Sequence, residues 1–381
     1  MVKDSTGDIN STSNYRGVTL CSFFSHLFEN ALRLKFGYFL VSDELQFGFK
    51  SKHSTSHALS CIDHFTARDS NVYVAFLDYS KAFDTISHSG LFLKLIDRNV
   101  PLCFLLVVIY WYMNMQYNCK WGKAYSDCFD VKCGTKQGGI LSPDFFSVYI
   151  NDLIKILRSS GIGCHLIKIF LACILFADDM TLMAPTRDSM QRLLNLCADY
   201  CSTFCLKFNV KKTKVLVFGK LNAHKDSLAR IYFQGEPIDF VDTCKYLGFH
   251  IVSGTHFKFS INEDLCGFFG SANSILSCMR QPRENVQLQL LYSNCVPRLT
   301  YGAAVKDPTA REKHRLNVAL NNAIRRIFGF RRWESIRHLR EFYHFDSIEI
   351  MFAKAKKRFE SSLANHDNRV LRFLSSFKPA E

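Results

Sequence analysis

The fold is decided by the stretch Cys173-Ile174-Leu175-Phe176-Ala177-Asp178-Asp179-Met180-Thr181-Leu182-Met183-Ala184. It has two adjacent carboxylates between two short runs of apolar and β-forming residues. This pattern is typical of a tight β-hairpin that carries Asp178 and Asp179 at its turn. Adjacent like charges repel, and a divalent cation is the usual means of keeping both ionised in a partly enclosed site. A solvated turn is the simpler explanation of an Asp-Asp pair taken by itself, so the rest of the chain must decide.

A second apolar, β-forming run over residues 72–77 ends at Asp78 and passes into a polar turn. If this run and the hairpin pair in one sheet, Asp78 joins Asp178 and Asp179 in a cluster of three carboxylates. Hard oxygen ligands suit Mg²⁺, and two ions roughly 3.5–4 Å apart can stabilise both the attacking and the leaving oxygen of an in-line displacement. The sequence therefore predicts a phosphoryl-transfer site with two Mg²⁺ ions, for which Mn²⁺ is an alternative.

Three motifs, taken in order, resemble those of a known family. They are Phe76-Leu77-Asp78-Tyr79-Ser80-Lys81-Ala82-Phe83-Asp84, Lys136-Gln137-Gly138-Gly139-Ile140-Leu141-Ser142-Pro143 and Phe176-Ala177-Asp178-Asp179. Their order and spacing resemble the palm motifs of reverse transcriptases, most closely those of non-LTR (LINE-like) retrotransposons. The resemblance covers nearly all of the chain. It implies an α+β, right-hand polymerase fold with fingers, a palm in which an antiparallel sheet packs on helices, and a helical thumb.

On this resemblance we expect three domains. Residues 1–70 would form fingers that lack their N-terminal part, residues 71–254 a catalytic palm with some fingers elements, and residues 255–381 a basic thumb. Apolar spacing predicts helices at 23–40, 102–113, 186–205, 265–279, 286–299 and 310–328, and a helix with Ser142 as N-cap. The run at 102–113 is too short to span a bilayer, which needs about 20 residues, and is expected to be buried. The helix at 23–40 should have an apolar face made of Phe24, Leu27, Phe28, Ala31, Leu32 and Leu34.

The resemblance also implies catalytic and metal-binding residues. Asp78, Asp178 and Asp179 would bind the metal ions. Lys212, in the element Asn209-Val210-Lys211-Lys212-Thr213, would protonate the departing pyrophosphate, whereas Lys211 or Lys214 would be simple phosphate contacts.

Nucleotide-binding residues follow on the same basis. Lys3 and Arg16 would contact the triphosphate, although both also fit ordinary surface cations. Tyr79 would lend its backbone carbonyl to a metal, and Phe83 would lie beneath the sugar and select deoxynucleotides. Gln137 and Gly138 would face the nucleotide and template; the family usually has Pro before this Gln, where the chain has Lys136.

Two further segments carry implied nucleic-acid contacts. Residues 46–55 match a Gln-x-Gly-Phe-Arg segment, with Lys50 in place of Arg, and interleave basic, aromatic and hydroxyl side chains as a template groove needs. Residues 244–250 resemble a strand that grips the primer end through Tyr246, Leu247 and Gly248.

Composition agrees with a nucleic-acid enzyme. The formal net charge is +14, with arginines and lysines dense after residue 320, which favours polyanion binding. The expected partners are an RNA template, a DNA primer and dNTPs, with no membrane, and the oligomeric state stays open.

Fifteen cysteines without a disulfide-like spacing or a targeting segment indicate reduced thiols in the cytoplasm or nucleus.

The leading hypothesis is an RNA-directed DNA polymerase. The alternative is a catalytically silent, truncated remnant of a retroelement that still binds nucleic acid. An RNA-templated RNA polymerase is disfavoured by Phe83 and by the Phe-Ala pair in front of Asp178.

Overall fold

The computed structural model describes residues 8, 10–11, 14–15, 17–66, 70–278 and 283–376. The chain forms two compact units. The first comprises Met1–His53, Tyr73–Val215 and Ala229–Asp239, and the second Ser54–Val72, Leu216–Leu228 and Phe240–Glu381. The division into fingers, palm and thumb stays a prediction.

A four-stranded sheet carries the motifs that decide the fold. Its strands lie in the order β10 (Lys214–Phe218), β1 (Val72–Asp78), β9 (Asp179–Ala184) and β8 (Cys173–Phe176). Strand β9 runs antiparallel to both β1 and β8, with Asp78 opposite Asp179 and Phe176 opposite Asp179. The apolar run before Asp78 and the hairpin therefore share one sheet, as predicted.

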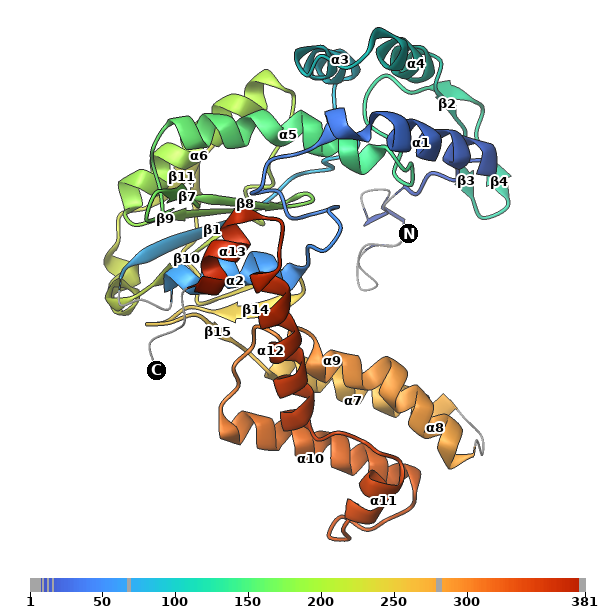
Figure 1. Cartoon of the computed structure of the whole chain (residues 1–381), viewed down its shortest axis with the longest axis vertical. Coiled ribbons are helices and arrows are strands. Elements are labelled where there is room, and N and C mark those ends of the chain that lie inside the picture. Colours follow the sequence, from blue (N-terminus) through green and yellow to red (C-terminus); the bar gives the residue numbers. More distant parts are fainter. Residues whose placement is uncertain are drawn as a thin grey trace. The chain divides into compact units, whose positions relative to one another are not determined.

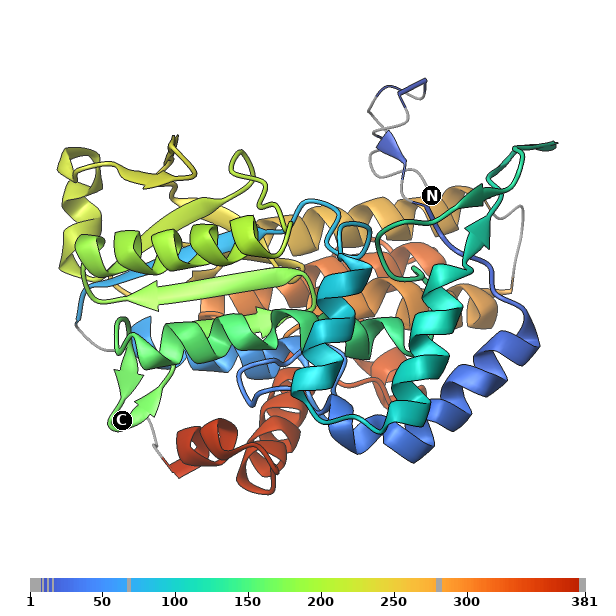
Figure 2. The same ribbon diagram turned by 90° about the horizontal axis from the view of Figure 1, so that it is seen from above.

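Two long helices, α5 (Ser142–Ser159) and α6 (Arg187–Thr203), lie side by side on one face of this sheet (Figures 1 and 2). The face of α5 that is buried consists of apolar residues at helical spacing: Phe145, Phe146, Tyr149, Ile150, Leu153 and Leu157. Thr186 caps α6 by accepting a hydrogen bond from the Ser189 N–H. Ser142, however, is already the first helical residue of α5 and not its N-cap, which is Leu141.

The remaining elements of the first unit are short helices and two-stranded hairpins. The helical ones are α1 (Phe23–Phe36), the 3-10 turn Gly37–Leu40, α3 (His88–Asp97) and α4 (Leu102–Met113). The hairpin strands are β2 (Gln116–Tyr117) with β5 (Phe129–Asp130), β3 (Lys120–Trp121) with β4 (Ala124–Tyr125), β6 (His165–Leu166) with β7 (Ile169–Phe170), and β11 (Ile231–Phe233) with β12 (Glu236–Ile238).

The helices α1 and α4 form where predicted, but the predicted apolar face of α1 is mostly exposed and α4 is not buried all round as expected. Helix α1 buries Glu29, Leu32 and Phe36 and exposes most of its expected apolar face. Helix α4 buries one side only. Its outer side exposes Leu102, Leu106, Tyr110 and Met113. Both helices carry more apolar residues than they bury, so several of these side chains are exposed.

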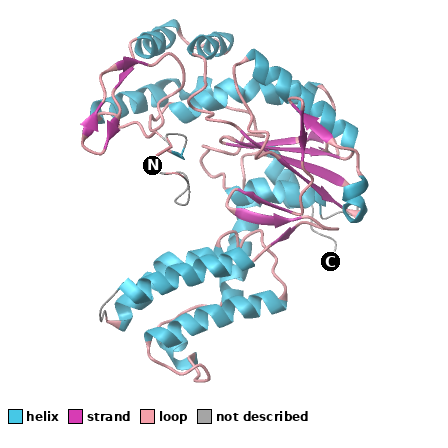
Figure 3. Ribbon diagram, turned by 180° about the vertical axis from the view of Figure 1, so that it is seen from behind, coloured by secondary structure: helices cyan, strands magenta, loops and turns pink. Residues whose placement is uncertain are grey.

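The second unit contains helix α2 (Thr55–Thr66), a 3-10 segment at Lys220–Ser227 and a small sheet of β13 (Thr243–Tyr246), β14 (Phe249–Val252) and β15 (Lys258–Phe259). After β15 the described residues form helices without strands (Figure 3). These are α7 (Asn262–Cys278), α8 (Glu284–Leu290), a π-turn (Leu291–Cys295), α9 (Val296–Thr300), α10 (Ala310–Ile327), α11 (Arg337–Phe342), α12 (Ile348–Ala364) and α13 (Arg369–Ser376).

The C-terminal helices share a core of their own, with Phe268, Leu299 and Leu320 fully buried in it. The helix predicted at 286–299 is real but broken, because a π-turn separates α8 from α9. In the part of the chain that the structure describes, no helix combines the length and the apolar character that a membrane crossing requires.

Candidate active site

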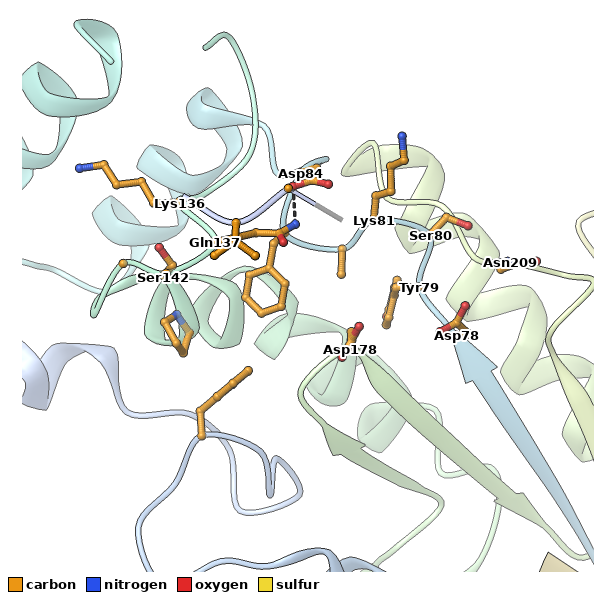
Figure 4. Close-up of a pocket in the computed structure, with 18 of the residues that line it drawn as sticks. Asp78, Tyr79, Ser80, Lys81, Asp84, Lys136, Gln137, Ser142, Asp178 and Asn209 are labelled. Atoms are coloured by element: carbon orange, nitrogen blue, oxygen red, sulfur yellow. Dashed lines mark hydrogen bonds between the residues drawn. The ribbon is translucent and has the colours of Figure 1, made fainter. Parts of the chain in front are cut away.

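The three predicted carboxylates meet at one end of the central sheet. Asp78 is the last residue of β1 and Asp179 the first of β9, and the two are cross-strand partners. Directly opposite residues of an antiparallel pair point to the same face, with Cβ atoms roughly 4.5–5.5 Å apart. Asp178 lies in the two-residue turn between β8 and β9, and Figure 4 shows it at the hairpin tip beside Asp78.

The backbone around these residues is held by local hydrogen bonds and one unusual conformation. Ala177, the first turn residue, has φ 56°, in the left-handed region that non-glycine residues seldom adopt. The Asn209 N–H donates to the Asp78 carbonyl at 2.8 Å, and the Ser80 N–H donates to the Lys207 carbonyl. The end of β1 is therefore tied to the segment that brings Lys212 to the site.

The site is strongly negative. Burial, together with the charges of Asp178 and Asp78, raises the pKa of Asp179 to about 6. Lys212 opposes this shift, and its Nζ lies 3.3 Å from Asp78 Oδ2. A cation bound among these carboxylates would offset their mutual repulsion.

The carboxylates fit Mg²⁺ by their chemistry, since all three offer hard oxygen ligands. Within the described ranges, no set of three or more His, Cys, Asp or Glu side chains is arranged to enclose one metal ion. Mg²⁺ is usually held by one or two carboxylates together with water and substrate phosphates, and not by a cage made of protein groups alone. The site is compatible with that kind of binding.

A pocket of about 880 Å³ opens in front of Asp78 and Asp178. Phe83 lines it and is half-buried, with its ring centroid 4.9 Å from that of Phe146 and 6.0 Å from that of Phe49. The Phe83 ring is thus held between core residues of α5 and the segment that precedes α2. Tyr79 contributes only its backbone to this region, because its ring is buried and stacked on Phe208 at 4.1 Å.

The loop before α5 forms another wall of the pocket. The Gln137 side-chain amide donates to Asp84 Oδ1 at 2.6 Å, as Figure 4 shows, and the Thr19 N–H donates to the Gln137 carbonyl. Gly138 has φ 132°, and a Cβ there would lie 2.7 Å from the Thr19 carbonyl oxygen. Only glycine fits at this point, so the close approach of the two segments fixes the path of the loop.

The segment Leu45–Phe49 supports the hairpin. The Phe47 N–H donates to the Leu175 carbonyl at 2.7 Å, and the Leu175 N–H donates to the Leu45 carbonyl. Gly48 then passes so close to the turn that a Cβ would lie 2.1 Å from the Ala177 nitrogen.

The expectation that Lys50 faces a template groove is wrong. Its ammonium group donates to the backbone carbonyls of Ser42 and Asp43, and burial lowers its pKa to about 8.

Other predicted residues lie elsewhere. Lys3 and Arg16 lie outside the described residues. Tyr246 ends β13, while Leu247 and Gly248, with φ of 48° and 80°, form the turn to β14. Residues 244–250 are therefore a hairpin and not the single strand that was expected.

Three residues with contacts at the pocket escaped the sequence analysis. Asp84 orients Gln137, Asn209 lines the pocket, and Glu29 accepts a hydrogen bond from the Leu141 N–H. Asp84 and Asn209 lie inside motifs already quoted, so their place was available although their contacts were not. No periodicity marks Glu29, because it is a charged residue on the buried side of α1.

The sequence model of the reverse transcriptase (RNA-dependent DNA polymerase) family matches residues 3–251. The chain belongs to this family. The resemblance drawn from the three motifs is thereby confirmed. The antiparallel sheet packed on helices agrees with the right-hand polymerase fold expected of this family.

Three Drosophila retrotransposon proteins are similar to this reverse transcriptase chain. The Retrovirus-related Pol polyprotein from type-2 retrotransposable element R2DM of Drosophila melanogaster is 29% identical over 220 residues, covering 56% of this chain and 20% of that protein. The probable RNA-directed DNA polymerase from transposon BS of the same species is 24% identical, covering 97% and 42%. The RNA-directed DNA polymerase from mobile element jockey of Drosophila funebris is 22% identical, covering 95% and 40%.

The chain therefore spans less than half the length of each of these relatives. Among solved structures, telomerase from Candida tropicalis in complex with a TWJ fragment of telomeric RNA is 13% identical, with a TM-score of 0.45, and the match covers 94% of this chain and 57% of that one.

Proposed function

We propose that this chain is an RNA-directed DNA polymerase that transfers a nucleotide from a dNTP to a primer 3′-hydroxyl. The observation that carries the proposal is the meeting of Asp78, Asp178 and Asp179 at the mouth of a pocket lined by Phe83 and Gln137. Membership of the reverse transcriptase family supports it. The 3′-hydroxyl attacks the α-phosphate, a P–O bond forms, and the bond to the departing pyrophosphate breaks.

In this proposal the chain's own residues mainly position groups. Asp78, Asp178 and Asp179 would hold two Mg²⁺ ions, or Mn²⁺ in their place. When bound, the ions would supply charge that stabilises the attacking and leaving oxygens. Lys212, whose Nζ lies 3.3 Å from Asp78 Oδ2, would give a proton to the leaving pyrophosphate.

Phe83 would select the sugar in this pocket. Its ring is held by packing on Phe146, so it cannot move away easily to admit a 2′-hydroxyl. Gln137 and Gly138 would contact the nucleotide and template, and Tyr79 would offer its backbone carbonyl. Lys3 and Arg16 would contact the triphosphate, and the turn at Tyr246, Leu247 and Gly248 would hold the primer end.

Template-directed extension tests the proposed function. We expect the protein to extend oligo(dT) on poly(rA) with dTTP and Mg²⁺, and to add no dGTP and nothing without template. Phe83→Val should raise UTP use relative to dTTP by roughly tenfold, because the smaller side chain removes the clash with the 2′-hydroxyl. Unchanged sugar selectivity would exclude the role of Phe83, and no extension despite duplex binding would favour the silent binding remnant.

A further inference from the structure

A buried ion pair joins α1 to the loop that carries Gln137. Glu29 of α1 is 3% exposed, and Lys136 is 7% exposed. Lys136 Nζ lies 3.7 Å from Glu29 Oε1 and 3.7 Å from the centre of the Trp111 ring on α4. Figure 4 shows the Lys136 side chain pointing away from Asp178. Its ammonium group therefore contacts Glu29 and Trp111 and not the catalytic carboxylates.

The two charges depend on each other. Burial lowers the pKa of Lys136, and the neighbouring carboxylate of Glu29 opposes that shift. Removing either partner from a buried pair leaves the other charge without compensation, which destabilises the surroundings far more than removing both. The Trp111 ring adds a cation–π contact that also needs the charge on Lys136.

Glu29 holds the loop at a second point. Its other oxygen, Oε2, accepts a hydrogen bond from the Leu141 N–H at 3.1 Å, directly before α5 begins. Between Lys136 and Leu141 the chain makes a tight turn in which the Gly139 N–H donates to the Lys136 carbonyl. A Cβ on Gly139 would lie 3.0 Å from Glu29 Oε2, so this turn fits closely around the carboxylate. One buried carboxylate therefore fixes both ends of the segment that contains Gln137 and Gly138.

We propose that Glu29 and Lys136 are positioning residues for nucleotide binding, whose buried ion pair holds the Gln137–Gly138 segment in place. The proposal rests on the proposed polymerase function, because the ligand that it concerns is the incoming dNTP. The chain has Lys136 where the family resemblance expects proline. In this chain a buried ion pair restricts the loop in the place of a proline ring.

The test uses two variants that keep the shape of the site. Glu29→Gln retains an oxygen that can accept from the Leu141 N–H but removes the charge, and Lys136→Met retains the aliphatic stem but removes the ammonium group. The double variant replaces the pair by two neutral side chains. Asp152→Asn is the control, because it removes the charge from a partly buried pair of the same unit, in which Lys94 Nζ lies 2.5 Å from Asp152 Oδ2, and Asp152 does not line this pocket.

Two readouts are measured on the full chain. In steady-state extension with dTTP, each single variant should raise KM by roughly tenfold with a smaller change in kcat, and the double variant should recover most of that loss. In hydrogen exchange followed by mass spectrometry, the amides of residues 137–141 should exchange faster in each single variant and not in Asp152→Asn. If Glu29→Gln fails to fold, Lys136→Met tests the same pair from the other side.

The outcomes separate this proposal from the proposed function. Unchanged exchange at residues 137–141 in both single variants would overturn the positioning role, whatever the activity. The proposal would also be overturned if the fold increase in KM of the double variant equalled the product of the increases of the two single variants. The two residues would then act independently. If the single variants exchange faster than wild type but wild type itself extends no primer, the structural role is retained and the polymerase function alone is contradicted.

Discussion

At the scale of single residues, the electrostatics of Asp179 give a testable consequence for stability. Burial and two neighbouring carboxylates raise its pKa from 3.8 to about 6 in the folded chain. The folded state therefore binds this proton more tightly than the unfolded state, so stability falls as pH rises from 3.8 through 6 and stays lower above. In metal-free protein, the ionised Asp179 is destabilising at neutral pH.

We expect Asp179→Asn to stabilise the metal-free protein at pH 7.5. The gain should be roughly 1 kcal/mol, after a discount for the partly exposed side chain, which solvent screens. Thermal unfolding in EDTA at pH 7.5 and pH 4.5 measures it, with the exposed Asp188→Asn as control. The gain should shrink at pH 4.5. A variant less stable than wild type at pH 7.5 would show that the three carboxylates do not repel each other as described.

Sequence reasoning located the residues whose place follows from local pattern. Asp78 closes a continuous apolar run and Asp178 occupies a hairpin turn, so strand pairing brings them together. Sequence reasoning could not find Glu29. The partner of Glu29, Lys136, is distant in sequence, and a buried glutamate is favourable only where tertiary packing brings such a partner to it. Lys50 was misread for the same reason, since its contacts with Ser42 and Asp43 depend on the fold of the loop.

At the scale of elements, the segment before α2 sets the position of the catalytic hairpin. Gly48 passes the turn so closely that a Cβ would lie 2.1 Å from the Ala177 nitrogen and 3.0 Å from the Phe176 carbonyl carbon. Both are backbone atoms, so a side chain at Gly48 cannot be accommodated by rotating a neighbour. The hairpin, or the segment itself, would have to shift.

We expect Gly48→Ala to lower kcat by roughly 10²-fold, because a displacement of about 1 Å at reacting groups has an effect of that size. Single-turnover extension measures the chemical step, and circular dichroism checks that the fold is retained. Gly270→Ala is the control, since a Cβ there meets nothing within 4 Å. A Gly48→Ala enzyme with wild-type kcat would mean that the hairpin does not depend on this contact.

Helix positions were easier to predict than helix faces. Helix α5 buries the residues that its period indicates because it packs on both the sheet and α6. Helix α1 has apolar residues on more than one side, and Phe23, Phe24 and Leu34 are more than 70% exposed. Period alone cannot decide which side is buried when apolar residues surround the helix.

At the scale of the whole molecule, the net charge of +14 and the position of the arginines favour binding to a polyanion. Arg326, Arg331, Arg332 and Arg337 lie exposed on or next to the C-terminal helices α10 and α11. Binding to an RNA–DNA duplex should therefore weaken as salt rises, by roughly 10³-fold between 50 and 200 mM if about six phosphates are contacted. This binding does not require the carboxylates of the active site.

The most direct test of the account is the rate of primer extension by Asp178→Asn compared with wild type. Both proteins receive the same poly(rA)/oligo(dT) duplex, dTTP and Mg²⁺, and duplex binding is measured in parallel by fluorescence anisotropy. We predict that wild type adds dTMP, and that the variant binds the duplex equally well but is slower by at least roughly 10²–10³-fold. Equal incorporation by the two proteins, or binding by both without incorporation by either, would contradict the assignment of catalysis to this hairpin.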